Sequence, residues 1–139
     1  MNWQKLLIAF IVVFVVLQVL SFVIHRIILD SDYKAITDVF RPQADMESKM
    51  WISWVTGLIF AFFFVYVFAK GYENKGIMEG IRYGLVIGCF MSIPSIYGQF
   101  MVYELPYSLI LKWLFSDFIT LVIIGIVAAL IYKPQVQPA

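Results

Sequence analysis

The chain has 139 residues, of which 63% are hydrophobic and 14% are charged, and its formal net charge is +1. This composition excludes a soluble globular domain, and a chain without a basic stripe is not typical of nucleic-acid-binding proteins. Four apolar stretches are each long enough to cross a hydrocarbon core about 30 Å thick. We therefore predict an all-α membrane protein with four transmembrane helices in an antiparallel up-down bundle and a short interfacial helix in the first loop.

The first span is predicted over residues 6–24. Its start resembles a signal peptide, but the apolar run is too long and His25-Arg26 follows it instead of a small-residue cleavage site, so we expect the span to be retained. Gln18 is its only strongly polar interruption. His25 is the only histidine in the chain and is expected to be an interfacial residue. A b-type haem would need a second axial ligand from another chain.

The loop of residues 25–49 holds most of the acidic residues. Within it, Tyr33, Ile36 and Phe40 recur at helical spacing, while Lys34 and Asp38 fall on the other side of the same helix. This pattern predicts a short amphipathic helix in the plane of the lipid headgroups. We expect its apolar side to face lipid or the bundle.

The second and third spans, predicted over residues 50–69 and 77–97, both carry small residues at every fourth position. In lipid, such rows let helix backbones approach closely, which stabilises helix pairs. The link of residues 70–75 is short enough to make the two helices antiparallel neighbours, so we predict that the rows face each other. A second interpretation is that the row of the third span lines a passage for a substrate. The rows are Ser53, Gly57 and Ala61 in the second span, and Gly76, Gly80, Gly84, Gly88 and Ser92 in the third.

The fourth span, predicted over residues 108–132, contains Asp117. This residue lies about 13 Å along the helix from Ser108, near the middle of the membrane. A carboxylate at that depth is disfavoured by about 2.5–3.5 kcal/mol unless it is protonated or hydrogen-bonded. We expect Asp117 to face the bundle interior in a buried polar layer with Ser92 or Gln18. Three roles stay open: a structural carboxyl, a carrier of protons or cations, or an interfacial residue if the span begins later.

The sequence contains no pattern typical of a catalytic or metal site. Its single cysteine, Cys89, cannot form an internal disulfide or a redox pair. No His, Cys, Asp or Glu residues fall at convincing metal-ligand spacing, and neither a Ser-His-Asp pattern nor a phosphate-binding loop is present. We therefore predict a non-enzymatic protein without cofactor or metal.

The whole chain resembles small four-span inner-membrane proteins of bacteria, a family of uncharacterised function. The resemblance implies an inner-membrane location and brings no activity with it. The chain lacks the first-span glutamate of small multidrug transporters and the cysteine pairs of disulfide-forming or vitamin K-type membrane enzymes. The motifs that carry the resemblance are Phe40-Arg-Pro42, Ser48-Lys-Met-Trp51, Tyr72-Glu-Asn-Lys-Gly76 with Glu79-Gly80 and Tyr83-Gly84, and Ile131-Tyr-Lys-Pro134.

These observations favour a protein that acts by helix–helix association, either as an accessory subunit of a larger membrane complex or as a homo-oligomer. Its expected partners are the lipid bilayer and another membrane protein or a second copy, with no nucleic acid. The alternative is a small ion, proton or solute transporter or channel with Asp117 in the passage. Basic residues divide equally between the two sides, but the long acidic loop favours both termini inside. Residues 134–139 are predicted to be a flexible tail.

Overall fold

The computed structural model describes residues 1–133, and these residues are helical with short connecting segments. Four helical stretches in this range are long and apolar enough to span a membrane: Trp3–Ile28, Met50–Lys70, Ile77–Val102 and Tyr107–Ile131. The prediction of an all-α protein with four candidate spans is confirmed. The predicted tail, residues 134–139, lies outside the described residues.

Two of the spans contain a wider π-helical segment. The first consists of α1 (Trp3–Phe22) and the π segment η1 (Val23–Ile28), so His25 lies inside the helix and not beyond its end. The third consists of α5 (Ile77–Ile87), the π segment η3 (Gly88–Ser92) and α6 (Ile93–Val102). Pro94 is the second residue of α6, and because proline has no N–H to donate, the helix departs from regular α geometry in the turn before it.

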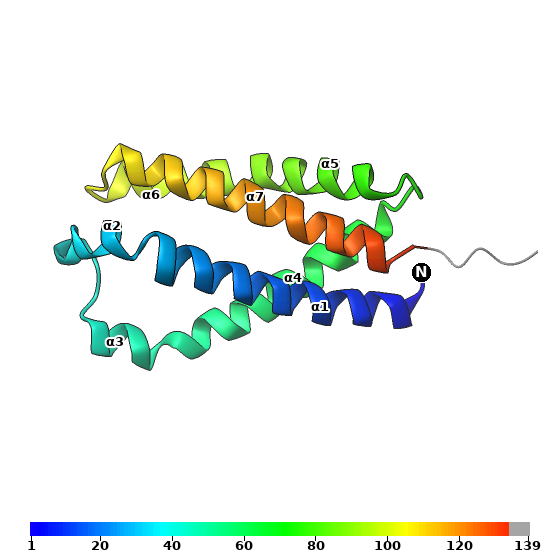
Figure 1. Cartoon of the computed structure of the whole chain (residues 1–139), viewed down its shortest axis with the longest axis horizontal. Helices are drawn as coiled ribbons and strands as arrows, with labels where there is room; N and C mark the ends of the chain where they lie inside the picture. Colours follow the sequence, from blue (N-terminus) through cyan, green and yellow to red (C-terminus); the bar gives the residue numbers. More distant parts are fainter. Residues whose placement is uncertain (134–139) are drawn as a thin grey trace, which may run out of the picture.

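The four spans form an antiparallel bundle in which three pairs of neighbouring helices pack along each other (Figure 1). α5 packs along α7 (Tyr107–Ile131), α7 packs against α1, and α1 packs against α4 (Met50–Lys70). On the fourth side, the Tyr83 hydroxyl of α5 donates a hydrogen bond to the Phe64 carbonyl of α4 at 2.7 Å. Figure 1 shows α4 leaving its neighbours toward α3, so α4 and α5 meet only near the link between them.

Apolar side chains form two clusters, one at each end of the bundle. The larger joins α1, α4 and α7 and includes Leu6, Val65 and Ile124, all fully buried. It lies at the end that holds the amino terminus and the end of α7, where the Asn2 backbone N–H donates to the Tyr132 hydroxyl at 3.1 Å. The smaller cluster lies at the other end around Ile96, Leu105, Leu109 and Ile110.

The predicted pairing of the two small-residue rows is wrong, because the glycines of α5 face α7. A methyl group added at Gly84 would lie 2.7 Å from the carbonyl carbon of Leu121, and one at Gly88 would lie 2.6 Å from the Phe118 ring. Gly76 precedes α5 with φ of +71° and takes no part in this contact. The bulky Tyr83 stands between α5 and α4 instead.

The row on α4 faces α1 over part of its length. Ala61 is fully buried in the larger apolar cluster, which includes residues of α1. A methyl group added at Gly57 would clash with the Gln18 amide and lie 3.5 Å from the Phe14 ring. Ser53, one turn earlier, is exposed. The close contact between α4 and α1 therefore ends near Gly57.

The first loop contains more helical structure than the single short helix expected. It comprises α2 (Asp30–Lys34), a 3₁₀ turn η2 (Thr37–Val39) and α3 (Gln43–Ser48). The apolar side chains of Tyr33, Ile36 and Phe40 pack on the smaller apolar cluster, and Lys34 and Asp38 are exposed. The loop thus covers one end of the bundle with its apolar side.

Candidate functional site

Polar side chains from four helical segments meet beneath α2. We call His25, Tyr33, Ser92, Trp113 and Asp117 the polar cluster. The imidazole Nδ1 of His25 is hydrogen-bonded to the Tyr33 hydroxyl at 2.6 Å, and the Trp113 indole N–H donates to the same hydroxyl at 2.9 Å. His25 belongs to η1, Tyr33 to α2 and Ser92 to η3, and α7 supplies Trp113 and Asp117. π-helical segments are frequent at functional sites, and both π segments of this chain contribute here.

The hydrogen bonds of Tyr33 accommodate two protonation states of His25. A tyrosine hydroxyl has one proton and two lone pairs, and an indole N–H can only donate. With Trp113 on one lone pair, the hydroxyl proton can be donated to Nδ1 of a neutral imidazole. A protonated imidazole can instead donate from Nδ1 to the second lone pair. The contact between His25 and Tyr33 therefore survives a proton gain at His25.

Asp117 follows Trp113 by one helical turn and is half-buried. Its carboxyl group lies close enough to interact with the Ser92 hydroxyl and with His25. The Asp117 carboxyl thus lies near Ser92, one of its two expected partners, and near His25. The structure does not bring Gln18 into the same layer, because the Gln18 amide lies against Gly57 of α4.

Two contacts hold α2 against α7, one within the polar cluster and one beside it. The Lys112 ammonium group pairs with the Asp32 carboxylate at 2.7 Å, next to the hydrogen bond between Trp113 and Tyr33. Burial raises the pKa of the Tyr33 hydroxyl above its ordinary value of 10.0; the Trp113 hydrogen bond lowers it, and the charges of Asp32 and Asp117 raise it further. Tyr33 is therefore a neutral hydrogen-bonding group at physiological pH.

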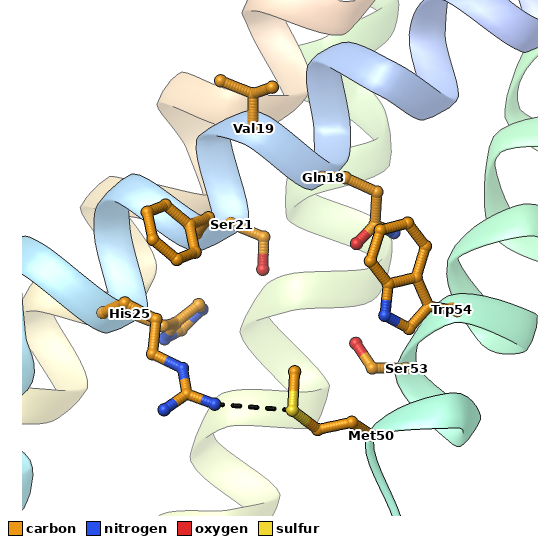
Figure 2. A pocket seen from close by; sticks show the side chains of 9 residues that line it. Gln18, Val19, Ser21, His25, Met50, Ser53 and Trp54 are labelled. Carbon is orange, nitrogen blue, oxygen red and sulfur yellow. Dashed lines mark hydrogen bonds between the residues drawn. The ribbon is translucent and has the colours of Figure 1, made fainter. Parts of the chain in front are cut away.

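A hollow of about 530 Å³ lies between the first span and α4, at the same end of the bundle (Figure 2). Its polar lining comes from Gln18, Ser21, His25, Arg26 and Ser53. The Arg26 guanidinium donates to the Met50 sulfur at 3.6 Å, and the dashed line in Figure 2 marks this contact. His25 belongs to both the hollow and the polar cluster, because it lines the hollow while its Nδ1 is hydrogen-bonded to Tyr33.

Sequence reasoning missed three members of this region. From its position in the sequence, His25 is expected to lie at the membrane interface. No sequence pattern predicts the π-helical segment that contains it. Trp113 could have been found, because it precedes Asp117 by four residues and so shares its helix face. From the sequence, Arg26 is expected only to mark the end of the first span.

The chemistry available in the polar cluster is proton exchange and hydrogen bonding. Within residues 1–133, no group of three His, Cys, Asp or Glu side chains lies close enough to hold a metal ion. A carboxyl group and an imidazole can each gain and lose a proton, and His25 lies in the last part of the first span. Comparison with protein-family models, curated proteins and solved structures finds no match for the chain.

Proposed function

We propose that the chain is a non-enzymatic integral membrane protein that acts through helix–helix association in the bilayer, as an accessory subunit of a larger complex or as a homo-oligomer. The observation that carries this proposal is the exposure of α4. Every residue from Met50 to Thr56 is exposed, whereas Ala61, Phe64 and Phe68 are buried further along. Among the described residues, the other helices of the chain therefore bury side chains only in the second half of α4.

The side of α4 that faces away from α1 offers a contact surface. Ile52, Val55, Ile59 and Phe63 lie on it at helical spacing, and between 42% and 57% of each residue is exposed. We call these four residues the outer ridge. Transmembrane helices associate by van der Waals packing and not by hydrophobic exclusion of water, so a regular ridge of this kind suits a second helix.

The proposed setting is the bacterial inner membrane with both termini inside. The amino terminus and the end of α7 lie together, as the hydrogen bond between Asn2 and Tyr132 shows, so they share one side of a membrane. The link between α4 and α5 lies on that side as well and carries Lys70 and Lys75. Short basic segments favour the cytoplasmic side.

Extraction into polymer-bounded native discs, followed by mass measurement, tests the proposal. We expect particles that contain more protein than one 16.1 kDa chain, either a second copy or a stoichiometric partner. Ile59→Trp should reduce this assembly, because it changes the shape of the outer ridge. Ile119→Trp is the matched control, since Ile119 is 53% exposed on α7. A single chain per disc for the parent protein would contradict the proposal.

Transport of protons or cations is the second candidate function, and one observation favours it. Asp117 lies near Ser92 and His25, and ionisable residues within spans often mark ion or proton pathways. Asp117→Asn keeps the size and much of the hydrogen bonding of the side chain but cannot carry a proton. In proteoliposomes, this variant should lose proton or cation flux, while Asp38→Asn, at an exposed loop position, should keep it. Absence of flux from the parent protein would exclude the candidate.

A further inference from the structure

The hollow between the first span and α4 has the features of a binding site for a charged amphiphile. We propose that it holds the headgroup of an anionic phospholipid from the surrounding bilayer, with the lipid phosphate at Arg26. This site is separate from the outer ridge, which lies on the opposite side of α4. The proposal therefore goes beyond association and does not depend on it.

Arg26 has unused capacity to bind an anion. A guanidinium group has five N–H donors, and its bond within residues 1–133 goes to a thioether sulfur, which is a weak acceptor. The ion pairs among these residues involve other cations: Lys34 with Asp30, Lys112 with Asp32, Arg41 and Lys49 with Asp45, and Lys75 with Glu73. A phosphate group matches the planar donor fork of arginine and would satisfy two of its donors at once.

Neutral polar groups line the hollow next to the basic end. Figure 2 shows the hydroxyl groups of Ser21 and Ser53 turned into the same space, with the Gln18 amide beside Trp54. Among the described residues, no fully buried side-chain N or O atom lacks a hydrogen-bond partner. Ser53 is itself exposed, and the hydroxyl groups of Ser21 and Ser53 open into the hollow. An occupant with oxygen acceptors can bond those that are open.

The order of the lining residues matches the order of groups in a phospholipid. His25 and Arg26 lie in the last part of the first span, where it reaches the membrane boundary. Gln18 lies about 10–12 Å deeper along the helix, and the aromatic side chains of Phe22 and Trp54 flank the space. Charged groups thus lie at the outer end of the hollow and neutral polar groups lie deeper, as the phosphate and the glycerol esters of a phospholipid do. A free inorganic anion would use only the first of these.

The size of the hollow suits the headgroup of a lipid. Its volume of about 530 Å³ falls within the range of small-molecule sites, about 300–1,000 Å³. The negative surface of a membrane rich in anionic lipid also attracts basic groups near the membrane boundary.

Fluorescence quenching by brominated lipids tests the proposal, because Trp54 lines the hollow and Trp51 does not. Two reporter proteins are compared in lipid discs, both with Trp3→Phe: one keeps Trp54 and carries Trp51→Phe, and the other keeps Trp51 and carries Trp54→Phe. Trp113 contributes the same background to both. Each reporter is measured with brominated phosphatidylglycerol and with brominated phosphatidylcholine at equal mole fraction.

We expect phosphatidylglycerol to be enriched at Trp54 by about fivefold over phosphatidylcholine, the factor that one basic group near a membrane surface provides. Trp51 should show no such preference. The preference should be lost in Arg26→Gln and kept in Arg41→Gln, whose arginine is paired with Asp45 outside the hollow. If Arg26→Gln fails to insert, Gln18→Leu supplies a second variant, which removes donors from the hollow and should weaken the preference.

Three outcomes would overturn the proposal. Equal phosphatidylglycerol preference at Trp51 and Trp54 would indicate ordinary attraction of the whole membrane edge. An unchanged preference in both Arg26→Gln and Gln18→Leu would separate the effect from the hollow. Relief of the quenching by excess inorganic phosphate, but not by unbrominated phosphatidylglycerol, would assign the site to a free anion. Relief by unbrominated phosphatidylglycerol alone supports the lipid.

Discussion

Gly80 of α5 and Gly125 of α7 bring their backbones into direct contact. A methyl group added at Gly80 would lie 2.6 Å from the carbonyl carbon of Gly125, and one added at Gly125 would lie 3.1 Å from that of Gly80. Only glycine allows this approach, and a close approach increases the van der Waals contact that holds helices together in lipid. The pair of α5 and α7 is therefore the tightest part of the bundle.

Adding one methyl group at this contact should destabilise the protein. Gly84→Ala places its methyl group 2.7 Å from the Leu121 carbonyl carbon, so the helices must move apart. We expect a loss of about 1–3 kcal/mol in the free energy of unfolding, and a larger loss for Gly84→Leu. Thermal melts in detergent measure the effect. Gly98→Ala is the control, because no atom lies within 4 Å of its added methyl group; equal melting temperatures for Gly84→Ala and Gly98→Ala would contradict the packing.

The link between α4 and α5 depends on Glu79. Its carboxylate accepts hydrogen bonds from the backbone N–H groups of Glu73 at 2.5 Å and Lys75 at 2.8 Å. Glu79→Ala removes both acceptors and should destabilise the link by about 1 kcal/mol. Hydrogen exchange at the amides of residues 73 and 75 should become faster, while Glu104→Ala, at an exposed position in another loop, should leave it unchanged. Unaltered exchange in Glu79→Ala would show that the link is held in another way.

Tyr33 and Trp113 should be energetically coupled through their hydrogen bond of 2.9 Å. In a double-mutant cycle of Tyr33→Phe and Trp113→Phe, we expect a coupling energy of about 0.5–1.5 kcal/mol in unfolding. The cycle of Tyr33→Phe with Trp51→Phe should be additive, because Trp51 is exposed and the Tyr33 hydroxyl bonds to His25 and Trp113 instead. Additivity in both cycles would remove Tyr33 from the polar cluster.

The raised pKa of Tyr33 predicts a loss of stability at high pH. Its hydroxyl loses a proton less readily in the folded protein, chiefly because of burial, so the folded state holds this proton above pH 10.0 when the unfolded state has lost it. The stabilising contribution is complete below the ordinary pKa and disappears as the pH rises through the raised one. The difference in melting temperature between the parent and Tyr33→Phe should therefore shrink above about pH 10. A constant difference across that range would contradict the shift.

The sequence predicts the spans well and their mutual contacts poorly, for a physical reason. Long apolar runs identify a spanning helix whatever its neighbours are, so the four spans follow from composition alone. A row of glycines indicates that another helix approaches closely, but it does not identify which helix that is. The spacing of Gly125 and Ala129 in the fourth span was the available signal, since it forms a second small-residue pair.

The candidate site was predictable only in part. Asp117 draws attention because a carboxylate at membrane depth needs a partner, and counting along the helices places Ser92 near it. His25 could not be placed in the same way, because the π turn of η1 changes which face of the helix its side chain occupies. The hollow exists because α4 diverges from α1. The sequence pattern of neither helix predicts this divergence.

Photo-crosslinking from the outer ridge tests the proposed association most directly. Benzoylphenylalanine replaces Ile59 on α4 or, as the control, Ile119 on α7, which is equally exposed. Irradiation is carried out in intact membranes before any extraction. We expect a discrete protein adduct from position 59, with a second copy or a defined larger partner, and lipid adducts alone from position 119. Lipid adducts alone from both positions would contradict association through α4.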